Sequence, residues 1–173
     1  PMSTILKKWY KSPNPAVNVH RRDEPVATDT VFLDTPAIGG GETAAQIFVG
    51  TKSFVTDVEG MKSESQFVNT LEDNICSCGA PAKLISDQAQ VEISNKVKDI
   101  LCALPISDWQ SEPHQLHQNP CEQQYQTIKL MANTILDCTG SPAFLWLLCL
   151  GYVCFLLNNV AASSTGAIPI QVL

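Results

Sequence analysis

The spacing of hydrophobic residues changes about a third of the way along the chain. Before residue 60 there are three short stretches rich in β-branched and aromatic residues: Val26 to Asp34, Ala44 to Gly50 and Ser53 to Val58. Such stretches are typical of β-strands. The segment PAIGGGET between the first two is typical of a turn. These patterns predict a three-stranded meander.

After residue 60 helical spacing alternates with short apolar runs. Apolar residues recur every three to four positions in four segments, which predict helices over 63–77, 91–104, 121–137 and from about 143 to 162. The run KLIS (83–86) predicts a buried strand, and Pro105 to Trp109 predicts a further one. Strands that alternate with helices indicate an α/β domain with a mixed sheet.

The last helix contains the most apolar part of the chain, Ala143 to Leu157, which carries no charge. A membrane-spanning helix needs about 20 apolar residues. The fifteen residues here are too few, and no lysine or arginine follows them. We therefore expect a buried helix and no membrane partner.

Composition and charge divide the chain further. With 173 residues, 45% of them hydrophobic, it is long enough for one domain with a core and too apolar for a disordered segment. Residues 1–24 hold five of the eleven basic residues, and they predict an arm or linker before a domain over 25–162 and an irregular tail over 163–173. The domain then has six basic and fifteen acidic residues, a net charge of −9, which argues against general adhesion to nucleic acid.

The seven cysteines, an odd number, and the polar, basic start PMSTILKKWYKS predict an intracellular protein with free thiols.

Three carboxylates are placed where they could bind a metal ion. Asp29 lies inside a predicted strand, Asp87 follows the KLIS strand, and Glu122 begins a predicted helix. Oxygen ligands from separate elements suit Mg²⁺ or Mn²⁺. Each residue also has a structural alternative: a turn or strand-end residue for Asp29, a helix cap for Asp87, and a favourable dipole interaction for Glu122. Asp34 competes with Asp29 as the first ligand.

The stretches DTVF, AQIFVG, LISD, WQSEPHQLHQNPCEQQYQTIK and PAFLWLLCLGYVCFLLN, in this order, resemble the integrase catalytic core of retrotransposons, and most closely the copia-type group of diatoms. The resemblance covers about residues 20–162. The resemblance rests on the order and spacing of these motifs: 57 residues separate Asp29 from Asp87, and 34 separate Asp87 from Glu122. It implies a ribonuclease-H-like fold, with a five-stranded mixed sheet flanked by helices.

The resemblance also implies a function. In such enzymes an Asp-Asp-Glu triad, here Asp29, Asp87 and Glu122, binds two Mg²⁺ or Mn²⁺ ions, processes the DNA ends of the element and joins them to target DNA. Gln118, Asn119 and Lys129 would then contact DNA; the alternatives are capping or turn formation for the first two and a solvated helix face for Lys129. The resemblance further implies a nuclear location for an active enzyme and self-association into a homodimer.

A second hypothesis is a degenerate, non-catalytic fragment that at most binds a protein or itself. Glutamines, at 123 and 124, follow Glu122 where related integrases usually carry a basic residue, and only three basic residues follow Asp87. Each lost phosphate contact weakens DNA binding.

Overall fold

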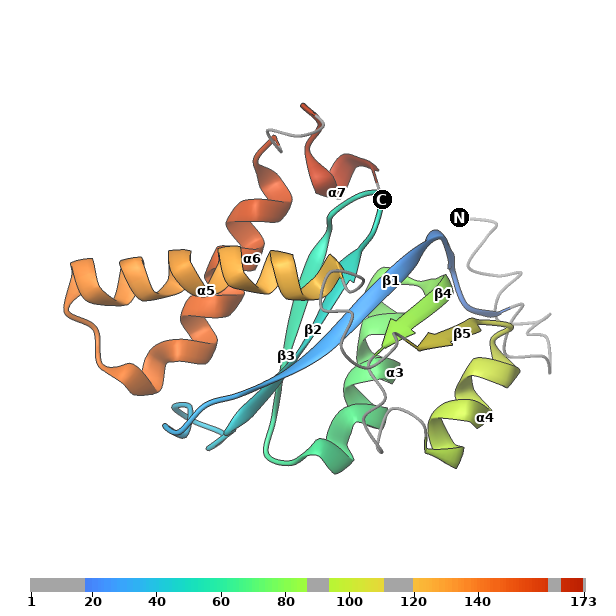
Figure 1. Cartoon of the computed structure of the whole chain (residues 1–173), viewed down its shortest axis with the longest axis horizontal. Coiled ribbons are helices and arrows are strands. Elements are labelled where there is room, and N and C mark those ends of the chain that lie inside the picture. Colours follow the sequence, from blue (N-terminus) through green and yellow to red (C-terminus); the bar gives the residue numbers. More distant parts are fainter. Residues whose placement is uncertain (1–17, 87–93, 111–119, 162–165, 173) are drawn as a thin grey trace, which may run out of the picture.

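The computed structural model describes residues 18–86, 94–110, 120–161 and 166–172 of the chain. At its centre lies a five-stranded sheet with the strand order β3-β2-β1-β4-β5 (Figure 1). Strands β1 (Arg21–Phe32), β2 (Ala44–Gly50) and β3 (Thr56–Met61) form the antiparallel meander expected from the sequence.

The other two strands make the sheet mixed. Strands β4 (Ala80–Ser86) and β5 (Ser107–Gln110) run parallel to β1. Neighbouring parallel strands need a crossover connection. Helix α3 (Phe67–Cys78) lies between β3 and β4 in the sequence, and α4 (Asn95–Ala103) lies between β4 and β5. The predicted fold class, a ribonuclease-H-like mixed sheet flanked by helices, is confirmed.

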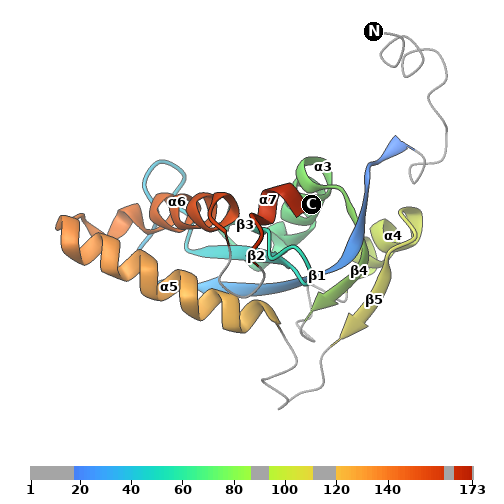
Figure 2. The same cartoon turned by 90° about the horizontal axis from the view of Figure 1, so that it is seen from above.

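The helices form two layers, one on each side of the sheet. Helices α3 and α4 pack on one side, where Phe48, Phe67 and Leu84 are buried. On the opposite side lie α5 (Pro120–Thr139) and α6 (Trp146–Asn159), which contact each other and lie away from α4 (Figure 2). The chain ends in the short helix α7 (Pro169–Val172), which contacts α6.

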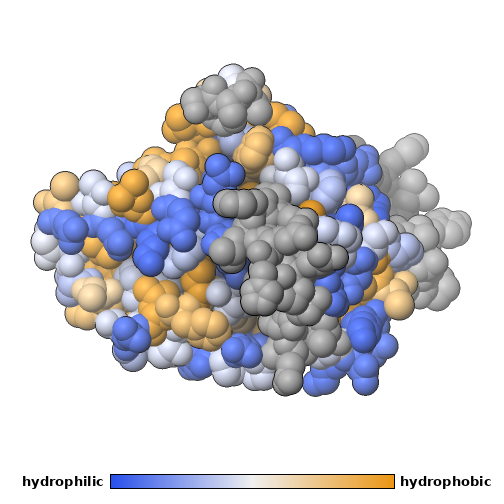
Figure 3. Space-filling view, viewed as in Figure 1, coloured by the Kyte–Doolittle hydropathy of each residue, from blue (hydrophilic) through white to orange (hydrophobic). Residues whose placement is uncertain are grey.

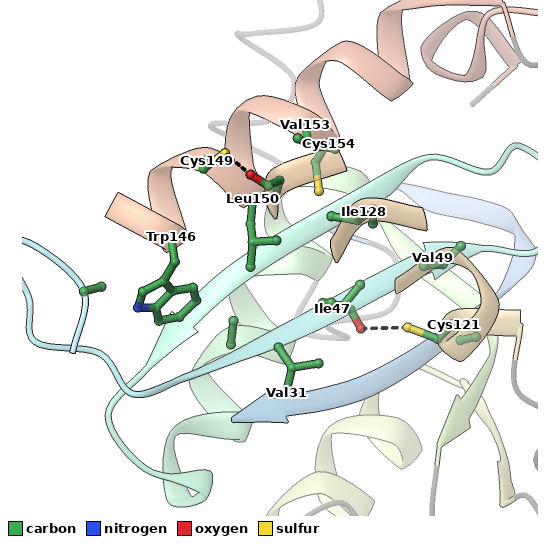
Figure 4. Packing of buried hydrophobic residues seen from close by; sticks show 14 of the residues in the cluster. Val31, Ile47, Val49, Cys121, Ile128, Trp146, Cys149, Leu150, Val153 and Cys154 are labelled. Carbon is green, nitrogen blue, oxygen red and sulfur yellow. Dashed lines mark hydrogen bonds between the residues drawn. The ribbon is translucent and has the colours of Figure 1, made fainter. Parts of the chain in front are cut away.

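The core between the sheet and helices α5 and α6 is formed by small and β-branched strand residues and by cysteines and aliphatic residues of the helices (Figure 4). The indole N–H of Trp146 donates a hydrogen bond to the carbonyl of Thr35 (2.8 Å). At the other end of α6, the Asn158 amide both accepts from the N–H of Thr56 and donates to its carbonyl, at 2.8 Å each. Helix α6 is thus attached at one end to the connection between β1 and β2 and at the other end to β3.

One side of α6 is buried and the other is exposed. Trp146, Leu150 and Val153 are buried, whereas Leu148, Tyr152 and Phe155 are exposed. No helix within the described ranges is long and apolar enough to span a membrane. The expected buried helix is therefore half-buried, with an apolar outer face.

Strand β1 begins within residues 1–24, the segment that the sequence predicts to be an arm or linker. Arg22 and Glu24 are buried, although both are charged. Their side chains form an ion pair, with 2.6 Å between Arg22 Nε and Glu24 Oε1. Hydrophobic patterning does not reveal a strand whose buried positions are charged, and this explains why the strand predicted to start at Val26 begins at Arg21.

Candidate functional site

Asp29 lies on the side of the sheet that faces α5. Ala27 and Val31, two residues before and two residues after Asp29 on β1, are both buried in the core beneath α5 and α6. Because side chains alternate between the two faces of a strand, the Asp29 side chain points to the same face. It is half-buried, and its partner across the β1–β2 pair is Ile47.

The first turn of α5 crosses the sheet at the level of Asp29. The Cys121 thiol lies 3.6 Å from the carbonyl oxygen of Ile47, the residue paired with Asp29 (Figure 4). On the β3 side, the Gln124 amide donates to the Thr56 hydroxyl at 3.4 Å. These two contacts show that the side of α5 that bears Gln124 faces β3.

Glu122 and Tyr125 lie on the side of α5 opposite to the side that bears Gln124. Successive residues of an α-helix are rotated by about 100°, so these two, three positions apart, share one side of the helix. Both side chains are half-buried. Burial raises the pKa of the Tyr125 hydroxyl, and the negative charge of Asp29 raises it further. Tyr125, on the same side of α5 as Glu122, is therefore close enough to Asp29 to respond to its charge.

The other expected site residues are placed differently. Asp87 follows Ser86, the last residue of β4, and lies outside the described residues, as do Gln118 and Asn119. Asp34 is exposed beyond the end of β1, five residues from Asp29 along the chain. Lys129 is exposed on α5, one turn beyond Tyr125, with its Nζ atom 5.9 Å from the centre of the tyrosine ring. The geometry thus associates Asp29, and not Asp34, with the start of α5.

The donor set suits a hard divalent cation, because carboxylate oxygens are the protein ligands that Mg²⁺ and Mn²⁺ prefer. Two of the three expected donors, Asp29 on β1 and Glu122 in the first turn of α5, are among the described residues. Among the residues that the structure describes, no group of three or more His, Cys, Asp or Glu residues is close enough to hold a metal ion. A complete site requires a further ligand, and in the sequence Asp87 is the candidate.

Two further residues on this side of the sheet, Tyr125 and Lys83, are not singled out by the sequence. Tyr125 could have been found from its position three residues after Glu122. Lys83 lies on β4 with its Nζ atom 4.9 Å from the centre of the Trp109 ring on β5. No spacing rule in the sequence brings Lys83 and Trp109 together, because β4 and β5 pair only in the folded sheet.

The comparisons with known proteins bear on the fold. No protein-family model matches the chain, and no curated protein matches its sequence. Among solved structures, the chain is similar to the HTLV-2 integrase catalytic core domain in complex with magnesium, in its dimeric form (TM-score 0.65, 16% identity, 86% of this chain and 93% of that one). The trimeric form of the same domain has a TM-score of 0.65 and 18% identity, and the match covers 86% of this chain and 95% of that one.

A chain in the cryo-EM structure of the simian T-cell lymphotropic virus intasome in complex with PP2A regulatory subunit B56 gamma is also similar (TM-score 0.70, 15% identity, 88% of this chain). The match spans 56% of that longer chain. At these identities the likeness establishes that the chain has the fold of retroviral integrase catalytic cores.

Proposed function

We propose that this chain is the catalytic core of a DNA integrase, which cuts and joins DNA strands by divalent-metal-dependent phosphoryl transfer. The observation that carries the proposal is the placement of Asp29 under the first turn of α5, the turn that contains Glu122. Asp87, directly after β4 in the sequence, is the third member of the triad. The shared fold with integrase cores supports the same assignment.

Phosphoryl transfer requires positioning and charge stabilisation more than covalent chemistry by the protein. Two bound Mg²⁺ or Mn²⁺ ions would supply activation of the attacking oxygen and stabilisation of the leaving one. Asp29 would hold them from a central strand, and Glu122 from a helix that contacts the sheet through Cys121. The HTLV-2 integrase core is similar in fold and is a complex with magnesium, which is consistent with this donor set.

The finer assignments rest on the sequence. The order of the motifs supports a copia-type retrotransposon as the source, and the substrates would be the ends of that element and its target DNA. An active enzyme would work in the nucleus. Gln118, Asn119 and Lys129 remain the proposed DNA contacts, and Lys129 is exposed on the same helix as Glu122.

A non-catalytic fragment is the second candidate, and one observation favours it. Helix α5 carries a single basic residue, Lys129, in its twenty positions. Loss of DNA affinity with an intact metal site is the expected property of such a fragment.

Metal binding tests the proposed site directly. We expect Mn²⁺ titrated into the full chain in a calorimeter to bind at least about tenfold more weakly to the Asp29→Asn variant, because this change removes a charged ligand at nearly constant volume. The matched control is Asp34→Asn, an exposed aspartate five residues away, which is expected to bind like the wild type. Equal affinity in both variants and the wild type would contradict the site.

We also propose that the chain forms a homodimer through the outer face of α6. This face carries Leu148 (63% exposed), Tyr152 (54%) and Phe155 (61%) at helical spacing. Gly151 lies among them, and a Cβ atom added there would meet no atom within 4 Å, so the ridge contains a notch. Hydrophobic residues also gather where α6 and α7 lie in Figure 3.

A second copy is the partner that this face fits best. Two negatively charged copies approach with least repulsion through a surface that has no charged residue, and α6 has none. A ridge beside a notch is self-complementary across a two-fold axis. One of the similar HTLV-2 integrase core structures is a dimeric form, which is consistent with this arrangement.

Sedimentation velocity tests the homodimer. We expect the wild type to dimerise at micromolar concentration and the Leu148→Glu variant to be at least about tenfold weaker, because a buried, unpaired carboxylate opposes association. Leu130→Glu on α5, where the leucine is 70% exposed, is the control and should leave the dimer intact. A monomeric wild type, or equal weakening by both substitutions, would overturn this proposal.

A further inference from the structure

The Lys83–Trp109 pair lies on the same face of the sheet as the candidate carboxylates. Ile85 and Trp109 both pack against the core on the α5 side. Lys83, two residues before Ile85 on β4, points to the same face. Both Lys83 and Trp109 are half-buried, so part of each side chain is accessible to a ligand.

This part of the face lies beside α5 and not beneath it. The helix packs on β1 and β2. From its start near β1 it then runs away from β4 and β5 (Figure 1). Among the described elements, α5 does not lie between β1 and Trp109 on this face. A ligand at Asp29 could therefore extend toward the tryptophan beside α5 and not across it.

The sheet register fixes how far apart these groups are. Trp109 pairs with Ile85, which pairs with Ala27, two residues before Asp29. With strands about 4.8 Å apart and a rise of about 3.3 Å per residue, the Cα atoms of Trp109 and Asp29 are separated by about 12 Å. That separation corresponds to about three nucleotides of a DNA strand.

We infer that Lys83 and Trp109 form a contact for the DNA strand next to the reacting phosphate, in which the indole stacks on an unpaired base and the ammonium group binds an adjacent phosphate. This inference rests on the proposed function. Stacking on an aromatic side chain accommodates any base, and lysine contacts to phosphate position the strand without reading its sequence.

Charge makes this pair more significant in this chain than in a basic protein. The domain over 25–162 has six basic residues. Lys96 and Lys98 lie on α4, in the layer on the opposite side of the sheet. Lys83 and Lys129 lie on the side of the sheet that carries Asp29. Of these four lysines, Lys83 and Lys129 lie on the side of Asp29, so each would contribute a substantial share of the local attraction for DNA.

A cation–aromatic contact at a surface also stabilises the fold to a small extent. A purely stabilising pair would therefore affect thermal unfolding and leave DNA binding unchanged, whereas a DNA contact would affect binding. The two roles are separable by experiment.

Fluorescence anisotropy of labelled DNA without divalent metal tests the inference independently of catalysis. The probes are a blunt duplex and the same duplex with a three-nucleotide single-stranded end. We expect Trp109→Leu to weaken binding of the duplex with the unpaired end by about tenfold or more and to abolish any preference for it over the blunt duplex. Circular dichroism checks that the variant is folded.

Lys83→Gln is the second variant, and Lys98→Gln on α4 is its matched control. Losing one phosphate contact should weaken binding of both duplexes and reduce the slope of log affinity against log salt concentration by about one. The control should leave the slope unchanged. Wild-type affinity in both Trp109→Leu and Lys83→Gln, or no DNA binding by the wild type, would overturn the inference. Failure of the metal titration alone would overturn the integrase assignment and leave this contact standing.

Discussion

Replacing Glu24 by alanine is expected to lower the free energy of unfolding by about 3–5 kcal/mol, because it leaves the buried guanidinium group of Arg22 without its counter-ion. The Arg22 and Glu24 side chains are only 2% and 6% exposed. Domains of this size are stable by about 5–15 kcal/mol, so the loss would unfold a substantial part of the population under mild denaturant. Urea denaturation followed by circular dichroism measures it.

Glu24 also organises the turn between β2 and β3. Its Oε2 atom accepts the backbone N–H groups of Lys52 (2.9 Å) and Ser53 (2.8 Å), and its Oε1 atom accepts the Ser53 hydroxyl at 2.6 Å. One carboxylate thus joins the start of the central strand to the turn between its neighbours. Alanine removes all of these hydrogen bonds together with the ion pair.

The pH dependence gives an independent test of the same interaction. Burial works against the charged form of Glu24, but hydrogen bonds from Ser53, Lys52 and Arg22 outweigh it and hold its pKa below the usual 4.5. A lowered pKa in the folded state contributes stability above pH 4.5, which is lost as the pH falls through the folded-state value. The wild type should therefore lose this contribution in acid.

The Arg22→Met/Glu24→Leu double variant is the control. It replaces both charges by apolar side chains of similar size, and such replacements are often neutral or stabilising. It should recover the part of the loss that comes from the unpaired Arg22 charge, while the loss of the Lys52 and Ser53 hydrogen bonds remains. If Glu24→Ala is as stable as the wild type, the ion pair contributes nothing.

The sequence predicts this fold well wherever hydrophobic spacing determines burial. Strand β2 is buried at all seven positions, and the predicted strand Ala44–Gly50 has the same limits as the observed one. The spacing of Ile128 and Ala132 likewise places α5 on the core. Prediction is weakest at Arg21–Glu24, where partner groups more than twenty residues away make burial of charge favourable.

The candidate site is only partly predictable for a related reason. Asp29 is noticeable in the sequence because a carboxylate inside a strand is unfavourable without a purpose. The position of Tyr125 beside Asp29, and of Lys83 over Trp109, depends on strand order and on the angle at which α5 crosses the sheet. Those features arise from packing of whole elements, and no local pattern encodes them.

Replacing Glu122 by glutamine is expected to reduce Mn²⁺-dependent nicking of supercoiled plasmid DNA by at least about a hundredfold. Phosphoryl transfer depends on charge stabilisation at the metals, and this change removes one negative ligand while keeping the size of the side chain. The thermal unfolding temperature should change little, because the Glu122 side chain is only half-buried in the first turn of α5.

The adjacent Gln123→Ala variant is the matched control, since Gln123 is exposed on the same turn and has no expected role as a ligand. Wild-type nicking that persists in Glu122→Gln would show that the activity arises elsewhere. An inert wild type that still binds Mn²⁺ through Asp29 would identify the non-catalytic fragment, with an intact metal site and insufficient attraction for DNA. Activity lost in Glu122→Gln and retained in Gln123→Ala would assign the chemistry to the face between α5 and β1.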